Sequence, residues 1–182
     1  MFADFKRLLS ELHKAKDYQW ELYMRVSFCT ACRISDIRKL KWQDVLNGNE
    51  CIVKEQKTGK IRRIPINDSN HQAILTLYKL LHKPPMTDYM FISNKTNEPF
   101  TTQYINRRLK MYRDKYHLKI THFSTHSLRK TFGRYVYDSM GHSAEALLLL
   151  NQILKHASVN TTKIYIGITQ GEIDGVFGNI NI

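Results

Sequence analysis

The sequence predicts a mostly helical α+β domain with a small three-stranded antiparallel sheet. Apolar residues recur every three or four positions over most of the chain, which is the periodicity of an amphipathic helix. Between Lys41 and Asn67 this pattern gives way to short β-type runs separated by the turn signals Asn47-Gly48 and Thr58-Gly59. Predicted helices before and after one block of strands in the sequence therefore define the fold class.

Capping residues and helix breakers delimit the helices. Ser35 is the expected N-cap of a short helix, while Pro84-Pro85 and Gly141 each end a longer one. Further N-caps are expected at Asp68 or Ser69, at Thr101 or Thr102, and at Thr161 or Thr162. The expected helices are about Ala3–Lys16, Tyr18–Ala31, Asp36–Leu40, 69–82, 102–116, Ser127–Met140, Ser143–Leu154 and a last helix that carries Tyr165.

The predicted sheet consists of two successive hairpins. Its strands are expected at about Trp42–Leu46, Glu50–Gln56 and Lys60–Ile66, and the second hairpin presents Lys57 at its tip. A short buried extended segment follows at Tyr89–Ile92. Because no repeat and no linker divides the chain, residues 1–182 are interpreted as a single domain with a C-terminal tail over 171–182.

Charge and hydropathy narrow the class of partner. Lys and Arg number 28 against 16 Asp and Glu, a net charge of +12 that indicates a polyanionic partner. Hydrophobic residues make up 42% of the chain, too many for a disordered basic tail. The longest apolar run, Ala146–Leu150, is far shorter than the roughly 18 residues that span a bilayer. We therefore expect a cytoplasmic, nucleoid-associated protein without a membrane partner.

The three cysteines are expected to be reduced thiols. Cys29 and Cys32 form a C-x-x-C pattern that also occurs in zinc and redox sites, but Cys51 stands alone and no second pair follows. His122 and His126 have the i, i+4 spacing of two zinc ligands, yet position 123 is Phe where the metalloprotease pattern has Glu. Neither pattern predicts a metal.

His126 and Arg129 are the first candidates for a functional site. At i and i+3 near a helix start they lie on one face and can converge on one small ligand. Arginine offers a planar fork of donors that matches phosphate oxygens, and free N–H groups at the helix start favour an anion as well. Alone, the pair is also compatible with a surface contact that has no function.

Four segments taken in order give a much more specific pattern: T-A-C-R-I-S-D with Arg33, K-T-G-K with Lys57, H-S-L-R at 126–129, and H-A-S-V-N-T-T-K-I-Y from His156 to Tyr165. In these segments the chain resembles the tyrosine recombinases, the phage-integrase family, whose fold is the DNA breaking-rejoining enzyme type. The resemblance extends from about Phe5 to Gly171.

The resemblance implies a role for each matching residue. Tyr165 would be the nucleophile that attacks a DNA phosphodiester and forms a 3′-phosphotyrosyl link. Arg33 and Arg129 would clamp the non-bridging oxygens, and His156 would donate a further hydrogen bond. Lys57 would protonate the departing 5′-oxygen, and His126 would help to manage the tyrosine proton. This scheme requires no metal ion and no other cofactor.

Some positions depart from the family's pattern. Asp36 stands where Glu is frequent and should still support the site, Lys130 occupies the place of a second His, and Lys155 precedes His156 where Gly is common. The family's enzymes usually carry a separate N-terminal helical domain, for which we expect no room within these 182 residues. We expect either a catalytic fragment or a compact recombinase of the kind that inverts promoter segments.

The expected partner is double-stranded DNA. The candidate DNA contacts are basic residues on the hairpin and on two helices: Lys60, Arg107, Arg108, Lys110, Arg113 and Lys130. A solvated helix face is the alternative for those near 107–113. The family implies a homo-tetramer on DNA, allows a monomer without it, and allows an accessory DNA-bending protein. Its C-terminal segment commonly docks on a neighbouring subunit, a role that the 171–182 tail suits.

Two other functions fit the same residues. One is a DNA-binding protein that keeps the fold without cutting, and the other is a type IB topoisomerase. The sequence does not indicate which DNA site is recognised, because phosphate contacts position a protein whereas base contacts specify. It also leaves integration, excision, inversion and resolution undistinguished.

Overall fold

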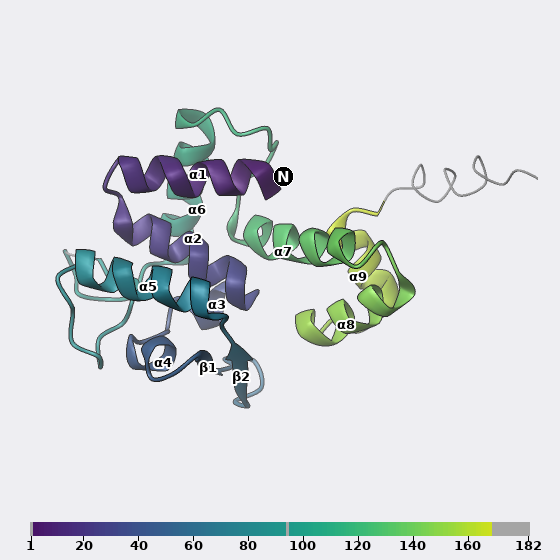
Figure 1. The fold of residues 1–182 in the computed structure, drawn as a ribbon, viewed down its shortest axis with the longest axis horizontal. Helices are drawn as coiled ribbons and strands as arrows, with labels where there is room; N and C mark the ends of the chain where they lie inside the picture. Colours follow the sequence, from purple (N-terminus) through teal and green to yellow (C-terminus); the bar gives the residue numbers. More distant parts are fainter. Residues whose placement is uncertain (1, 94, 169–182) are drawn as a thin grey trace, which may run out of the picture. The chain divides into compact units, whose positions relative to one another are not determined.

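A computed structural model describes residues 2–93 and 95–168 (Figure 1). The chain forms two units, Met1–Arg129 and Lys130–Ile182, and the boundary falls inside helix α7. The predicted 171–182 tail lies outside the described residues. The elements are α1 (Phe2–Lys14), α2 (Tyr18–Thr30), α3 (Ile34–Ile37), α4 (Gln43–Leu46), β1 (Glu50–Lys54), β2 (Ile61–Pro65), α5 (Asp68–Leu80), α6 (Thr102–Lys115), α7 (Thr125–Ser139), α8 (Ala144–Leu154) and α9 (Val159–Ile166).

Helix α2 is central to the first unit, as its dense apolar pattern predicted. It packs against both α1 and α5 (Figure 1). Trp20 and Tyr23 are almost fully buried on it, and the Trp20 ring stacks on Phe100 with centroids 5.4 Å apart. Burying each large apolar side chain contributes about 1.5–3 kcal/mol, so this helix anchors the unit's core.

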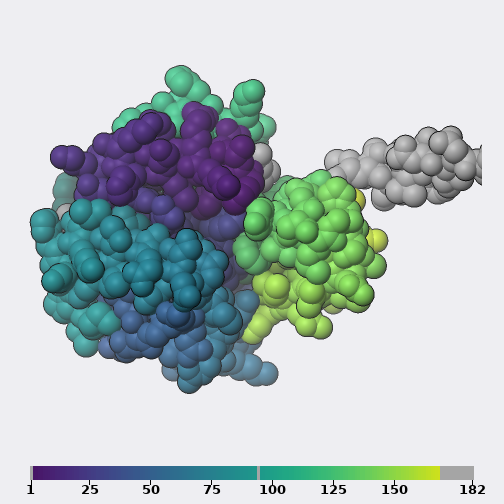
Figure 2. Space-filling view, viewed as in Figure 1, coloured from purple at the N-terminus to yellow at the C-terminus, as the bar shows by residue number. Residues whose placement is uncertain are grey.

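A buried carboxylate ties α1 to α2. Glu21 is only 2% exposed, and its two oxygens accept from His13 Nδ1 at 2.8 Å and from Arg25 at 2.9 Å. Burying a carboxylate without partners would cost several kcal/mol, so these two bonds are needed. Helices α1 and α5 both lie at the surface of this unit in Figure 2, and they border a hollow of about 550 Å³ that Glu21 also lines.

The sheet has two strands among the described residues, not the three predicted. Strands β1 and β2 pair antiparallel from Glu50↔Pro65 to Lys54↔Ile61. The expected strand Trp42–Leu46 is instead the short helix α4 with its preceding residue. Its two buried residues, Trp42 and Val45, are three positions apart, which is helical spacing, and Lys41 N–H donates to the Asp44 carboxylate at 2.8 Å. A five-residue run was too short to reveal this from periodicity.

Of the four helix caps predicted from the sequence, one is confirmed and three are wrong. Thr101 caps α6 by accepting from Tyr104 N–H, and α8 begins after Ser143, which accepts from Ala146 N–H. The caps that were wrongly predicted lie one to four residues from the real ones: Arg33 replaces Ser35, Asn67 replaces Asp68 or Ser69, and Ser158 replaces Thr161 or Thr162. Several polar residues lie close together at each site, and the backbone geometry selects one.

The second unit consists of the end of α7, then α8 and α9. Its core includes Leu150, Leu154 and Ile166, all at most 2% exposed. A Cβ added at Gly133 on α7 would lie 2.8 Å from Ile166 Cγ2, so the glycine permits the close approach of α9. In contrast, Leu148 is 55% exposed. Within the part of the chain that the structure describes, no helix is both long and apolar enough to cross a bilayer.

Candidate active site

Arg129 lies on α7 and reaches back to the end of α2. The residue is 6% exposed, and its Nη1 donates a short hydrogen bond to the carbonyl of Ala31. Ala31 is the C-cap of α2 in the left-handed conformation, with φ 47° and ψ 28°. A cation at this end of a helix complements the negative end of the helix dipole. The contact fixes one guanidinium at the turn between α2 and α3.

Arg33 belongs to this same turn. It is the N-cap of α3, with an extended backbone at φ −71° and ψ 152°, and only the buried Cys32 separates it from Ala31. The structure therefore brings Arg129, from a distant part of the sequence, to the turn that carries Arg33. A pair of arginines at one turn suits an anion with several oxygens, such as a phosphate.

Asp36 connects this turn to the hairpin. It is 5% exposed, and its Oδ1 accepts from the Ser35 hydroxyl at 3.1 Å and from the Gln56 N–H at 2.9 Å. Gln56 immediately precedes Lys57 in the tip between β1 and β2. Lys57 and Lys60 are both exposed on this tip. A buried carboxylate thus links the Arg33 turn to the lysine hairpin.

His126 lies in the first turn of α7, which begins two residues earlier than predicted. The start of this helix is fixed to α6, because Thr125 N–H donates to the Asn106 side-chain oxygen at 3.0 Å. His126 is exposed, whereas Arg129 is buried. His122 precedes the helix, so the pair of histidines lacks the helical i, i+4 arrangement of a zinc site. Among the described residues no three potential ligands of the His, Cys, Asp and Glu types form a metal-binding group.

His156 and Tyr165 meet in the second unit. Their rings contact edge to face with centroids 4.8 Å apart and an interplanar angle of 72°. The His156 Nδ1 is 3.0 Å from the hydroxyl of Thr162, which is fully buried. The nine-residue step between the two has a structural origin: α8 ends at the left-handed Lys155, Ser158 caps α9, and less than two helical turns then lead to Tyr165.

The basic residues of α6 divide into two groups. Arg107 and Lys110 are exposed. Arg108 is engaged internally: it pairs with Asp17 at 3.3 Å, and its guanidinium lies over the Trp20 ring at 5.3 Å. Such a cation–π contact with an ion pair is typical of a structural arginine. Among the predicted DNA contacts on α6, Arg107 and Lys110 therefore keep their charge at the surface.

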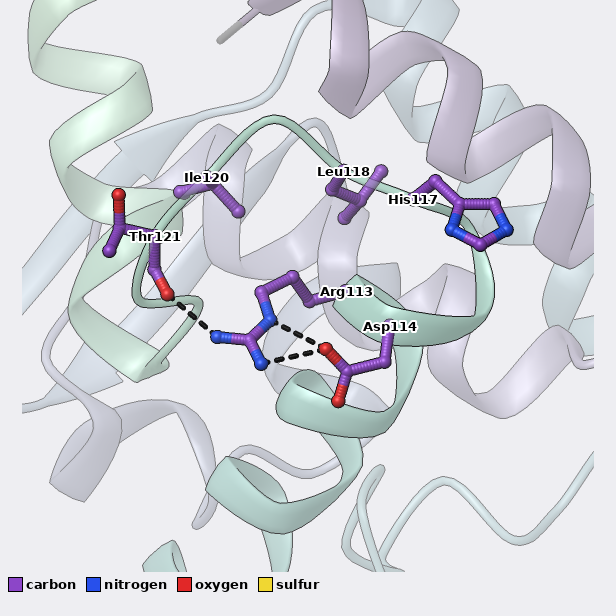
Figure 3. A pocket seen from close by; sticks show the side chains of 6 residues that line it. All are labelled: Arg113, Asp114, His117, Leu118, Ile120 and Thr121. Atoms are coloured by element: carbon purple, nitrogen blue, oxygen red, sulfur yellow. Dashed lines mark hydrogen bonds and ion pairs between the residues drawn. The ribbon is translucent and has the colours of Figure 1, made fainter.

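Arg113 is also held within its unit. It lines a hollow of about 450 Å³, where its guanidinium contacts the Asp114 carboxylate at 2.7 Å and the Thr121 carbonyl at 2.6 Å (Figure 3). In the second unit, the Lys130 ammonium packs beside Gly167, where an added Cβ would be 3.6 Å away. The sequence offered no signal for these pairings, because their partners include distant residues and backbone atoms.

The three cysteines are free thiols. Burial raises the pKa of Cys29 to about 11, and burial also raises the pKa of Cys32 and of Cys51. A thiol must lose its proton to bind a metal or to attack a disulfide, so protonated thiols are unsuited to either. The structure agrees with the prediction of reduced cysteines.

One part of the site was not predicted. Glu55, the residue after β1, is 3% exposed and accepts a hydrogen bond from the Thr58 hydroxyl at 2.7 Å, which spans the hairpin tip around Lys57. The signal in the sequence is a Glu three residues before a Thr-Gly turn. It was overlooked because a glutamate in a β-type run is usually solvated.

Comparisons with known proteins all identify the same family. Residues 2–172 match the family described as the phage integrase family. The chain is 33% identical over 170 residues to the probable integrase/recombinase YoeC of Bacillus subtilis, covering 90% of this chain and 89% of that protein. Such identity over nearly the full length of both chains indicates common ancestry.

Solved structures agree. A crystal structure of XerA recombinase superposes with a TM-score of 0.76 at 25% identity, covering 100% of this chain and 65% of that one. XerH site-specific recombinase, in a post-cleavage complex with its palindromic difH substrate, has a TM-score of 0.73 at 19% identity and covers 97% of this chain and 51% of that one. This chain therefore corresponds to half to two thirds of those structures.

Proposed function

The chain belongs to the phage integrase family, that of the tyrosine recombinases, and we propose that it cleaves and rejoins duplex DNA through Tyr165. The observation that carries this proposal is that all the residue types of the family's active site occur, in the family's order, within the matched residues 2–172. The enzyme would be a site-specific recombinase or integrase.

In the proposed reaction Tyr165 Oη attacks the scissile phosphorus and the bond to the 5′-oxygen breaks. The products are a 3′-phosphotyrosyl link and a free 5′-hydroxyl, so one proton leaves the phenol and one reaches the departing oxygen. We assign the second transfer to Lys57 and the first to His126. The covalent link retains the energy of the phosphodiester, so the 5′-hydroxyl of another strand can reverse the step without ATP.

The two arginines would stabilise the extra negative charge of the transition state. Arg129 is suited to this task because it is buried and because its bond to the Ala31 carbonyl fixes one edge of the guanidinium at the Arg33 turn. Preorganised donors in a site of low polarity are worth more than donors in water. His156 would add a donor beside the nucleophile, consistent with its ring contact to Tyr165.

DNA is the proposed partner. The net charge of +12, and the exposure of Lys60, Arg107 and Lys110, favour contact with a phosphate backbone. Arg108, Arg113 and Lys130 remain candidates, but the internal bonds of the two arginines make them weaker ones. The XerH structure was solved with a DNA substrate, which supports this partner by analogy of fold. A tetramer on two DNA sites, with the 171–182 tail docking on a neighbour, is the assembly we propose.

The test is covalent capture on DNA. Nicked duplexes with a randomised core are incubated with the full chain in EDTA, and denaturant-resistant protein–DNA adducts are isolated and sequenced. We expect adducts with the unchanged chain and with Tyr135→Phe, a more exposed tyrosine of the same unit, and none with Tyr165→Phe. A total absence of adducts would favour the non-cutting DNA-binding protein, and relaxation of plasmids of any sequence would favour the topoisomerase.

A further inference from the structure

We propose that Glu55 and Thr58 are positioning residues for DNA cleavage, which hold the hairpin tip so that the Lys57 ammonium reaches the departing 5′-oxygen. The inference rests on the proposed function, because it concerns the same reaction. It is carried by a hydrogen bond between a buried carboxylate and an exposed turn residue, on either side of Lys57.

The backbone alone already closes this turn. Gly59 N–H donates to the Glu55 carbonyl at 2.8 Å, and Glu55 N–H donates to the Lys60 carbonyl at 2.9 Å. Gly59 has φ +69°, a left-handed conformation that glycine adopts without strain, and no atom lies within 4 Å of where its Cβ would be. A hairpin that only had to reverse the chain would need no further contact.

The side chains add a second set of bonds. The Thr58 hydroxyl donates to Glu55 Oε2 at 2.7 Å and accepts from Lys60 N–H at 3.3 Å. Glu55 is only 3% exposed, although Thr58 is exposed. The bond therefore ties an exposed residue of the tip to a carboxylate that is fixed in the interior of the unit. This restricts the tip conformation more than the backbone bonds alone.

A second buried carboxylate holds the other side of the tip. Asp36 Oδ1 accepts from Gln56 N–H at 2.9 Å, and the Gln56 side-chain oxygen accepts from Lys39 at 2.6 Å. Residues 56 and 58 are thus each fixed by a buried acid, and Lys57 lies between them. Asp36 follows Arg33 by three residues, so its bond to Gln56 holds the tip at a fixed position relative to the turn that carries the proposed phosphate clamp.

Proton delivery explains why the tip must be fixed. As the Tyr165 Oη–P bond forms and the P–O5′ bond breaks, the Lys57 ammonium must lie within hydrogen-bond distance of the 5′-oxygen to give it a proton. Lysine has a flexible four-carbon chain, so the position of its Cα largely decides how often the ammonium is in place. A displacement of about 1 Å in such a group can cost about 100-fold in rate.

The test compares two leaving groups. A nicked duplex obtained by covalent capture is prepared with the ordinary 5′-oxygen and with a 5′-bridging sulfur at the scissile phosphate. A thiolate is a much weaker base than an alkoxide and departs without a proton. Single-turnover adduct formation is measured on both duplexes for the unchanged chain and for Thr58→Val, Thr58→Ser, Lys57→Ala and the double variant.

On the oxygen duplex we expect Thr58→Val to react about 10–100-fold more slowly, and Thr58→Ser to stay within about threefold, because serine keeps the hydroxyl. On the sulfur duplex Thr58→Val should approach the unchanged rate, as should Lys57→Ala. Adding Thr58→Val to Lys57→Ala should cause no further loss. Thr96→Val is the matched control, since the Thr96 hydroxyl accepts from Glu98 N–H at 3.4 Å in another exposed turn.

Two results would overturn the inference: an unchanged rate for Thr58→Val on the oxygen duplex, or a loss that persists with sulfur, which would indicate a structural role. The folding of Glu55→Leu is first checked by thermal unfolding, and the variant is then combined with Thr58→Val in a double-mutant cycle. Glu55→Leu should also form adducts more slowly on the oxygen duplex and should approach the unchanged rate on the sulfur duplex. If the unchanged chain forms no Tyr165-dependent adduct, the proposed function itself fails, so the two failures are distinguishable.

Discussion

The two units of the chain are built differently. The first unit has a dense aromatic core around α2 and buries charged groups such as Glu21 and Asp36 with their partners. The second unit buries a short series of aliphatic residues and leaves Leu148 and Ile164, 55% and 70% exposed, at its surface. Proteins open locally where few apolar groups are buried. We infer that the turn with Arg33 and Arg129, the proposed phosphate clamp, is held rigidly, whereas Tyr165, the proposed nucleophile, lies in the less stable unit.

The largest effect expected from a change in the first unit is on cleavage. Arg129→Lys should slow adduct formation about 100- to 1000-fold, because an ammonium cannot both bond to the Ala31 carbonyl and present a fork to phosphate. Arg7→Lys is the matched control, since Arg7 also donates to a backbone carbonyl, that of Tyr116, at 2.9 Å. Equal rates for both variants would contradict a phosphate role for Arg129.

A cavity in the second unit should affect that unit alone. Leu150→Ala should destabilise it by about 2–5 kcal/mol, because Leu150 is fully buried on α8. Hydrogen exchange should then quicken in α8 and α9 while α2 keeps its protection. The reciprocal variant is Leu12→Ala, a fully buried leucine of α1. If Leu150→Ala lowers protection in both units equally, they unfold as one.

Close packing of α9 on α7 should be sensitive to one methyl group. Gly133→Ala should cost about 1–3 kcal/mol, because its Cβ would lie 2.8 Å from Ile166 Cγ2. Ile166→Leu removes that branch, so the double variant should recover part of the loss in urea unfolding. A stability gain in Gly133→Ala, as expected from helix propensity alone, would show that α9 moves away easily.

High pH should also destabilise the first unit. Burial raises the pKa of Cys29 from 9.0 to about 11, and it also raises the pKa of Tyr23, so the folded first unit favours their protonated forms. The contribution of Cys29 to the free energy of unfolding is fully present below pH 9 and is lost as the pH rises through 11. For Cys29 the loss is up to about 3 kcal/mol. The free energy of unfolding, measured in urea between pH 8 and 11, should fall as the pH rises. Cys29→Ala should make this fall smaller.

Helical periodicity predicted most of the fold, because a stripe of apolar residues over three turns has few other interpretations. Short segments were predicted less well. The apolar residues of 42–46 fit a strand and a helix equally, and only the contacts in the folded chain decide between the two. The resemblance identified the candidate residues of the site, whose roles remain predictions. It did not reveal that Arg108 is paired with Asp17, because the two residues are 91 positions apart in sequence.

The left-handed turn at Ala31 has a consequence for genetics. The atom that receives the Arg129 guanidinium is a main-chain oxygen, which every amino acid at this position would supply. A scan that replaces side chains one at a time would therefore find Arg129 and overlook its acceptor. Exchanging the amide between residues 31 and 32 for an ester would weaken that oxygen as an acceptor and expose the contact directly.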